Sequence, residues 1–203
     1  MLRRFHLGLF SLLALAGVAS ATAPSKPGDS AWVTNAYVGR TAVLTVKAGS
    51  PSTNDGFNYN GVTDGEKGFV VPQGWRVVVK FRNLGDTIHT AIVVPAPKND
   101  ELKDSYPLSA AAFPGAARQI IVNAASPRLD VTLDFVAGTP GEYLILCGRL
   151  NHALNGQFLR FQVSKSAKYA EWKSFGDAKV GPPVSAKSGG CGGSADECCM
   201  TLG

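Results

Sequence analysis

Residues 129–135, LDVTLDF, alternate apolar and polar side chains at every position. Successive side chains of a β-strand point to opposite faces, so this pattern predicts a strand with one buried and one exposed face. The same alternation occurs at residues 41–47 and 76–82. We therefore expect a sheet that covers a hydrophobic core with one of its faces.

Further apolar runs, separated by turn signals such as Asp64-Gly65, predict additional strands. These runs lie at residues 87–95, 119–123, 142–147 and 158–163. The alanine-rich stretch 97–118 is mixed in character and predicts a loop with one helical turn. Seven or eight short strands with this spacing predict an all-β fold, a Greek-key sandwich or barrel.

The composition is that of a globular chain with one main domain. Of its 203 residues 45% are hydrophobic and only 17% are charged, and 23 are glycine. Few charges and many glycines favour strands and turns over long, charged helices. The net charge is +5 with no cluster of Lys or Arg, which argues against a nucleic-acid partner.

The amino terminus has the pattern of a cleaved export signal. Arg3 and Arg4 precede an apolar run at 7–19, and Ala19-Ser20-Ala21 then supplies the small-residue pattern of a cleavage site. The run is too short to remain as a membrane span. We predict a signal peptide at residues 1–21 and a periplasmic or secreted protein, with the Sec and twin-arginine routes both open.

The remaining chain divides into a domain at residues 22–163 and a tail at residues 164–203. From Ser164 onward the sequence is rich in Lys, Ser, Gly and Pro and predicts a flexible appendage without a core of its own. Trp172 and Phe175 are exceptions that could dock on the sandwich.

Three cysteines, Cys191, Cys198 and Cys199, lie close to the end of this tail. These three thiols are sufficient to bind Cu(I) and form a possible second thiol site, apart from the motif around Cys147 described below. The alternative is one disulfide and one remaining thiol, as expected in an oxidising compartment.

The chemistry-bearing residues gather in CGRLNHALNGQF at 147–158. Cys147, His152 and Gln157 are each separated by four residues, and His89 lies upstream in a predicted strand. Two imidazoles, one thiolate and a weak fourth ligand are the donors of a blue copper site. A strand would bring Cys147 to the end of the sandwich, a loop would turn His152 over the metal, and Gln157 would begin the next strand. The alternatives are a cysteine that packs as a small hydrophobe and a Gln157 that faces solvent, leaving three ligands.

Three stretches together resemble the cupredoxins, and most closely the sulfocyanin group. They are GFNYNGVTDGEKGFVVPQGWRVVVKFRNLGDTIHTAIVVP at 56–95, AFPGA at 112–116 and the 147–158 loop. The resemblance covers residues 56–163. It implies a β-sandwich with one type 1 copper ion, bound by His89, Cys147 and His152, that carries single electrons between respiratory proteins.

The chain departs from that pattern at two positions. Gln157 stands where the group has an axial methionine, as in the stellacyanin-like phytocyanins. Thr90 follows His89 where many cupredoxins have an asparagine that ties the ligand loops together, so the rigidity of the site is open to test.

The resemblance also implies how the protein meets its partner, a cytochrome c or a terminal oxidase. The apolar loop residues Leu150, Ala153 and Leu154 would form the docking surface around His152 of a monomer. Copper delivery or sequestration is the alternative function, to which the tail thiols would contribute. An enzyme is not expected, because multicopper oxidases and nitrite reductases need further histidines and an oxidase subunit needs a second cysteine near Cys147.

Overall fold

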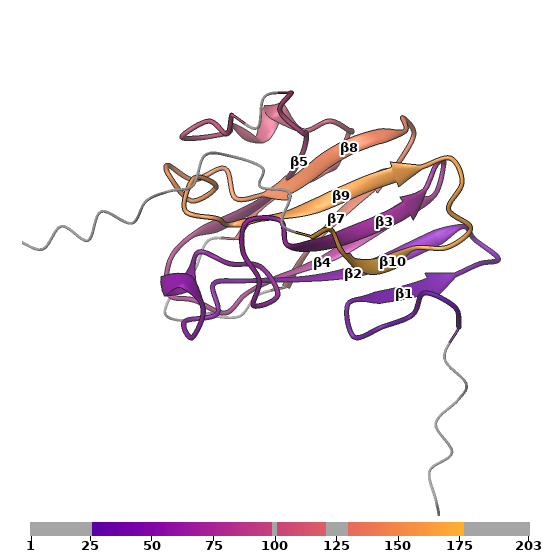
Figure 1. Cartoon of the computed structure of the whole chain (residues 1–203), viewed down its shortest axis with the longest axis horizontal. Helices are drawn as coiled ribbons and strands as arrows, with labels where there is room; N and C mark the ends of the chain where they lie inside the picture. The colour runs from indigo at the N-terminus through magenta and orange to yellow at the C-terminus, as the bar shows by residue number, and fades with distance from the viewer. Residues whose placement is uncertain (1–25, 99–100, 121–129, 177–203) are drawn as a thin grey trace, which may run out of the picture.

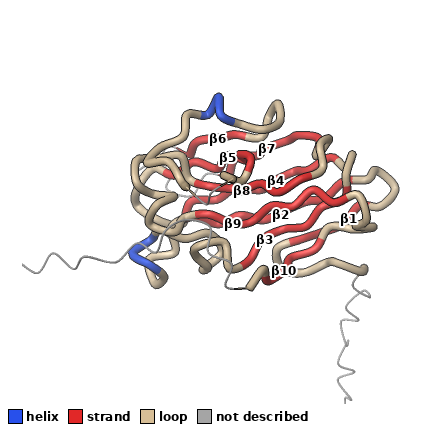
Figure 2. The backbone as a smooth tube through the Cα atoms, turned by 45° about the horizontal axis from the view of Figure 1, so that its top comes forward, coloured by secondary structure: helices blue, strands red, loops and turns tan. Residues whose placement is uncertain are grey.

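Two packed β-sheets make up the part of the chain that the computed structural model describes, residues 26–98, 101–120 and 130–176 (Figure 1). The first sheet has the order β1 (Val33–Ala36), β2 (Thr41–Ala48), β4 (Arg76–Asn83), β7 (Asp130–Val136). The second has the order β10 (Glu171–Ser174), β3 (Lys67–Pro72), β9 (Phe158–Ser164), β8 (Gly141–Leu146), β5 (His89–Pro95), β6 (Ala117–Ile120). Two short 3-10 turns, η1 (Asn54–Gly56) and η2 (Leu108–Ala110), lie in connecting loops (Figure 2). The all-β prediction is confirmed, with ten strands among these residues where seven or eight were expected.

The strands of the first sheet pair in a register that gathers their apolar side chains on one face. β2 lies parallel to β4 and places Leu44 opposite Val79, and β7 lies antiparallel to β4 and places Leu133 opposite Val79. All three side chains are fully buried. The apolar–polar alternation in the sequence therefore corresponds, as predicted, to strands with one buried and one exposed face.

Strand β5 has no such alternation because both of its faces are covered. Ala91 and Val93 belong to the core between the sheets. Ile92 and Val94 face the other way and pack in a second, smaller cluster, against which the loop after β5 contributes partly buried residues such as Tyr106. A strand buried on both faces is a continuous apolar run in the sequence.

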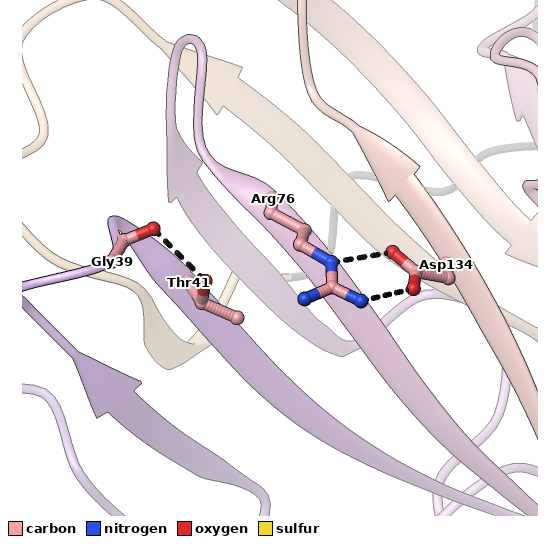
Figure 3. A network of polar contacts seen from close by, with 4 residues as sticks. All are labelled: Gly39, Thr41, Arg76 and Asp134. Atoms are coloured by element: carbon pink, nitrogen blue, oxygen red, sulfur yellow. Dashed lines mark hydrogen bonds and ion pairs between the residues drawn. The ribbon is translucent and has the colours of Figure 1, made fainter.

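Two ion pairs join β4 to β7 on the exposed face of the first sheet. Arg76 makes a two-pronged contact with Asp134, in which Nε lies 2.8 Å from Oδ1 (Figure 3), and Arg82 pairs with Asp130 in the same way. The guanidinium of Arg76 holds the pKa of Asp134 below its usual value. Such exposed pairs contribute little to stability. They reinforce the register that the buried face already sets.

β10 extends the second sheet beyond the boundary predicted at residue 163. It pairs antiparallel with β3, and the ring of Trp172 lies 4.8 Å from that of Phe69 and 6.0 Å from that of Trp32. The Ala170 amide donates to the Asn35 side chain at 2.8 Å. The docking of Trp172 explains why part of the predicted tail belongs to the sandwich.

Candidate metal centre

Neighbouring strands of the second sheet bring the candidate ligands to one end of the sandwich. His89 is the first residue of β5, Cys147 follows the last residue of β8, and Gln157 precedes the first residue of β9. β8 lies between β5 and β9 and is antiparallel to both. The end of β8 therefore meets the starts of both neighbours, as the sequence led us to expect for Cys147 and Gln157.

The loop between β8 and β9 returns His152 to the same point through its own backbone hydrogen bonds. The His152 amide donates to the Arg149 carbonyl and the Gln157 amide to the His152 carbonyl, each at 3.0 Å. The Cys147 amide donates to the Gln157 carbonyl at 3.1 Å and closes the loop. Four intervening residues on each side of His152 suffice for this compact turn.

The donor atoms converge on a small space. One atom each of His89, Cys147 and His152 lies within 4.8 Å of the others, and these three form the one such group of potential metal ligands found among the described residues. The Cys147 Sγ is 3.3 Å from Nδ1 of His152 and 3.9 Å from Nδ1 of His89. Both imidazoles thus present the same nitrogen to the thiol.

Gln157 completes the cluster with its amide oxygen. Its Oε1 lies 3.1 Å from Nδ1 of His89 and 2.9 Å from Nδ1 of His152, while its Nε2 donates to the Asn58 carbonyl at 3.1 Å. The side chain is fully buried. The alternative that Gln157 faces solvent does not match this position.

The donor set fits a copper ion. First-row metal ions bind imidazole nitrogen and thiolate sulfur at about 2.0–2.3 Å, so the donors of a trigonal site lie about 3.5–4 Å apart. The two Sγ–Nδ1 separations, 3.3 and 3.9 Å, are of this size. One thiolate and two imidazoles with a weak axial oxygen are the blue-copper combination. His89, Cys147, His152 and Gln157 would hold the ion.

Burial keeps both imidazoles ready to bind a metal. Burial, and next the charge of His152, lower the pKa of His89 to about 4. Burial also lowers the pKa of His152. A neutral imidazole has a free lone pair, which a protonated one lacks, so both side chains are competent ligands at neutral pH.

Thr90 ties the two ligand loops together. Its amide and its hydroxyl lie 3.4 and 3.6 Å from the Cys147 Sγ, and the same hydroxyl accepts a hydrogen bond from the Gly148 amide at 2.6 Å. A threonine at this position thus makes the link that many cupredoxins make with an asparagine. Hydrogen bonds around the cysteine sulfur also tune the potential of such a site.

Further contacts around the ligands were not predicted from the sequence. The Thr87 hydroxyl lies 3.2 Å from the far nitrogen, Nε2, of His89. Gly49, with a φ of +74°, leaves room for that ring, because a Cβ there would lie 2.7 Å from Nε2. The Tyr59 hydroxyl donates to the Thr90 carbonyl. Burial, and next the charge of Cys147, raise the pKa of Tyr59 well above its usual value, so the phenol remains a donor. The only sequence signal for these residues is the FNYNG stretch that contains Tyr59.

The three residues predicted as a docking surface do not share one environment. Leu150 is 65% exposed, Leu154 is partly buried, and Ala153 is 1% exposed. Ala153 packs in the smaller hydrophobic cluster with Phe158 and is therefore not part of any surface. The prediction for Ala153 is wrong because its methyl group fills the inner side of the loop.

Other predicted features lie outside the described residues. These are the signal segment at 1–21 and the tail cysteines Cys191, Cys198 and Cys199. Within the ranges that are described, no helix has the length and apolar character needed to cross a membrane.

Comparison with known proteins finds similar proteins by sequence and by structure. A family model described as "Sulfocyanin (SoxE) domain" matches residues 31–110. The sulfocyanin of Sulfolobus acidocaldarius is 27% identical over 146 residues, which are 64% of this chain and 68% of the relative. Reduced auracyanin from Roseiflexus castenholzii has a TM-score of 0.44 at 20% identity, over 62% of this chain and 97% of that one. Rusticyanin from Thiobacillus ferrooxidans has a TM-score of 0.41 at 19% identity, over 62% of this chain and 83% of that one.

The family match, the two-sheet fold and the donor cluster agree with one another. The matched residues include His89, and the remaining donors follow at the end of β8 and the start of β9. A thiol and two imidazoles at the end of an all-β sandwich fit type 1 copper. Together they support a blue copper cupredoxin whose sequence is similar to that of the sulfocyanins.

Proposed function

We propose that this protein is an exported carrier of single electrons whose copper is bound by His89, Cys147 and His152, with Gln157 as the axial ligand. The observation that carries the proposal is the convergence of the four donor atoms at one buried end of the sandwich. Copper, when bound, supplies the one-electron couple. The thiolate and imidazoles suit both Cu(I) and Cu(II), and the hydrogen bonds around them would hold the ligands in similar positions in both states.

His152 gives the site its contact with the surface. His89 is 2% exposed, whereas His152 is only partly buried and follows the exposed Leu150 by two residues. We propose that electrons pass through the His152 ring to a respiratory partner, a cytochrome c or a terminal oxidase, that docks over Leu150 and Leu154.

Sulfocyanin-like cupredoxins carry electrons and are not enzymes. Export through the signal at residues 1–21 would place this carrier in the periplasm or outside the cell. Copper delivery, the alternative, would depend on tail cysteines that lie outside the described residues, and we do not favour it.

The ligand assignment is tested by absorption spectroscopy of the copper-loaded protein. Donation from the Cys147 thiolate should give an intense visible band that reduction bleaches and reoxidation restores. Cys147→Ser should abolish this band and preserve the fold, as judged by far-UV circular dichroism. The matched control replaces Cys191, Cys198 and Cys199 by serine and should retain the band. A band that survives in Cys147→Ser and disappears in the tail variant would contradict the assignment.

A further inference from the structure

We propose that the FNYNG stretch, residues 57–61 in the loop between β2 and β3, is a positioning segment that holds the copper ligands at their spacing. This inference rests on the ligand set proposed above. Phe57, Asn58 and Tyr59 contact three of the four ligands, either directly or through Thr90. Asn60 anchors the segment to β2.

Asn58 sets the orientation of the axial amide. Its backbone carbonyl accepts a hydrogen bond from Gln157 Nε2 at 3.1 Å. An amide group whose nitrogen is bound in this way turns its oxygen to the opposite side, and Oε1 of Gln157 indeed faces the two Nδ1 atoms. The segment thereby selects the oxygen, not the nitrogen, as the fourth donor.

Phe57 restrains the exposed ligand. Its ring meets the ring of His152 edge to face, with centroids 5.0 Å apart and planes at 82°. The preceding turn η1 is tied to the ligand loop as well, because the Asn54 side chain donates to the Asn155 carbonyl at 2.6 Å and to the Phe57 carbonyl at 2.9 Å. The His152 ring therefore packs against a wall that is fastened to its own loop.

Tyr59 acts on the thiolate through Thr90. Its hydroxyl donates to the Thr90 carbonyl, and the Thr90 amide lies 3.4 Å from the Cys147 Sγ. The tyrosine is fully buried, with its ring against that of Phe81 at 6.2 Å between centroids. A fixed ring and a fixed hydroxyl keep the Thr90 donors aimed at the sulfur.

The segment is itself fastened to β2. The Asn60 side chain accepts a hydrogen bond from the Lys47 amide at 2.7 Å and donates to the Thr45 carbonyl at 2.9 Å. Gly61 has a φ of +74°, a left-handed conformation that side chains disfavour, and Tyr59 and Val62 close the turn by mutual backbone bonds. Strand β2 of the first sheet thus supports ligands supplied by the second.

The test compares Tyr59→Phe with Tyr143→Phe in the full-length protein. Both substitutions remove one hydroxyl from a buried ring. Tyr143 donates to the Thr139 carbonyl in the loop before β8, whereas Cys147 follows the other end of that strand. Tyr59→Phe should lower copper affinity about tenfold or more and shift both the charge-transfer band and the reduction potential. Tyr143→Phe should leave all three unchanged. Equal copper affinities, bands and potentials in the two variants would overturn the proposal for Tyr59.

A second pair keeps the test independent of the folding of Tyr59→Phe. Phe57→Leu should shift the band and the amide and ring NMR resonances of His152 in the copper-free protein, whereas Phe113→Leu, in a core cluster with Phe135, should not. His152 resonances unmoved by Phe57→Leu would overturn the proposal for Phe57. Failure of the ligand set itself is a separate result, since it appears as an intense band that survives in Cys147→Ser.

Discussion

The amide of Gln157 is expected to lower the reduction potential of the copper. An amide oxygen is a harder donor than a thioether and favours Cu(II) over Cu(I). For a one-electron couple, about 59 mV corresponds to a tenfold change in the relative stability of the two oxidation states. Gln157→Met should therefore raise the potential by on the order of one to a few times this amount. The two side chains have similar length, so the buried site should accept the change. Redox titration of both proteins measures the difference.

The matched control for this prediction is Gln162→Met, the same substitution on β9, where the side chain bonds to Glu142 at 2.6 Å on the exposed side. This variant should keep the wild-type potential. An unchanged or lowered potential in Gln157→Met would show that the amide does not reach the copper and that the site has three ligands.

His89 makes the stability of the copper-free protein depend on pH. Its pKa is about 4 in the folded protein and 6.5 without the shift, so the unfolded chain binds the proton more readily. The contribution of the neutral His89 to the free energy of unfolding should be fully present above pH 6.5. It should be lost as the pH decreases towards 4, by at most about 3 kcal/mol at about 1.4 kcal/mol per pH unit. Urea unfolding of the copper-free protein at several pH values measures this slope.

The control is His89→Gln, which carries no titrating group at that position. Its unfolding free energy should change less over the same pH interval. A wild-type slope equal to that of the variant would mean that His89 is not responsible.

At the scale of elements, β10 is expected to stabilise the sandwich without contributing to the metal centre. A chain that ends at Ser164 loses β10, the Trp172 ring against Phe69 and the bonds of Ala170 to Asn35. Loss of such aromatic packing should lower the free energy of unfolding by about 2–4 kcal/mol. The copper band should persist, because the donors come from β5, β8 and β9. Denaturant unfolding and the absorption spectrum measure the two effects.

A chain that ends at Gly176 keeps β10 and is the control. It should match the full chain in both measurements. Equal stability of the two shortened chains would contradict a stabilising role of β10, and loss of the band in the Gly176 chain would place the tail at the site.

The strands that the sequence predicts are those whose side chains alternate between core and solvent. β2, β4 and β7 have this pattern, and β5 and β8 are continuous apolar runs between turn signals. β1 and β10 have four residues each, too few for a period of two to stand out from chance. β3 combines a glycine and a proline in six residues and is buried through its neighbours rather than by its own pattern.

The sequence likewise predicts only those parts of the metal centre that have a recognisable pattern. Cys147, His152 and Gln157 are close in sequence, so their spacing alone predicts their convergence. His89 is the one further histidine outside the predicted signal segment. Tyr59 reaches Thr90 only through the tertiary fold, and Thr87, two residues before His89, has no sequence pattern that marks it as a contact. Ala153 has the same apolar character as its neighbours, and only the turn of the loop decides that it faces inward.

At the scale of the whole molecule, the two ends of the sandwich carry different surfaces. β4 runs from Arg76 to Asn83, and the loop after Asn83 leads to His89 at the copper end. Leu150, which is 65% exposed, lies at the same end, in the loop between β8 and β9 that carries His152. Val136, 56% exposed, pairs with Arg76 at the far end. Two apolar side chains of similar exposure thus differ in their distance from the ligands.

This difference predicts that Leu150→Asp slows electron exchange while Val136→Asp does not. Exchange between oxidised and reduced copies requires two His152 edges to approach, and a carboxylate on each copy would repel the other there. The rate of self-exchange, measured by NMR line broadening in mixtures of the two redox states, should fall about tenfold or more in Leu150→Asp. The absorption band should be unchanged in both variants, because neither side chain binds the metal. High salt should recover part of the lost rate, since screening weakens repulsion between exposed charges. Equal slowing in both variants would place the contact elsewhere and would separate Leu150 from the path of the electron.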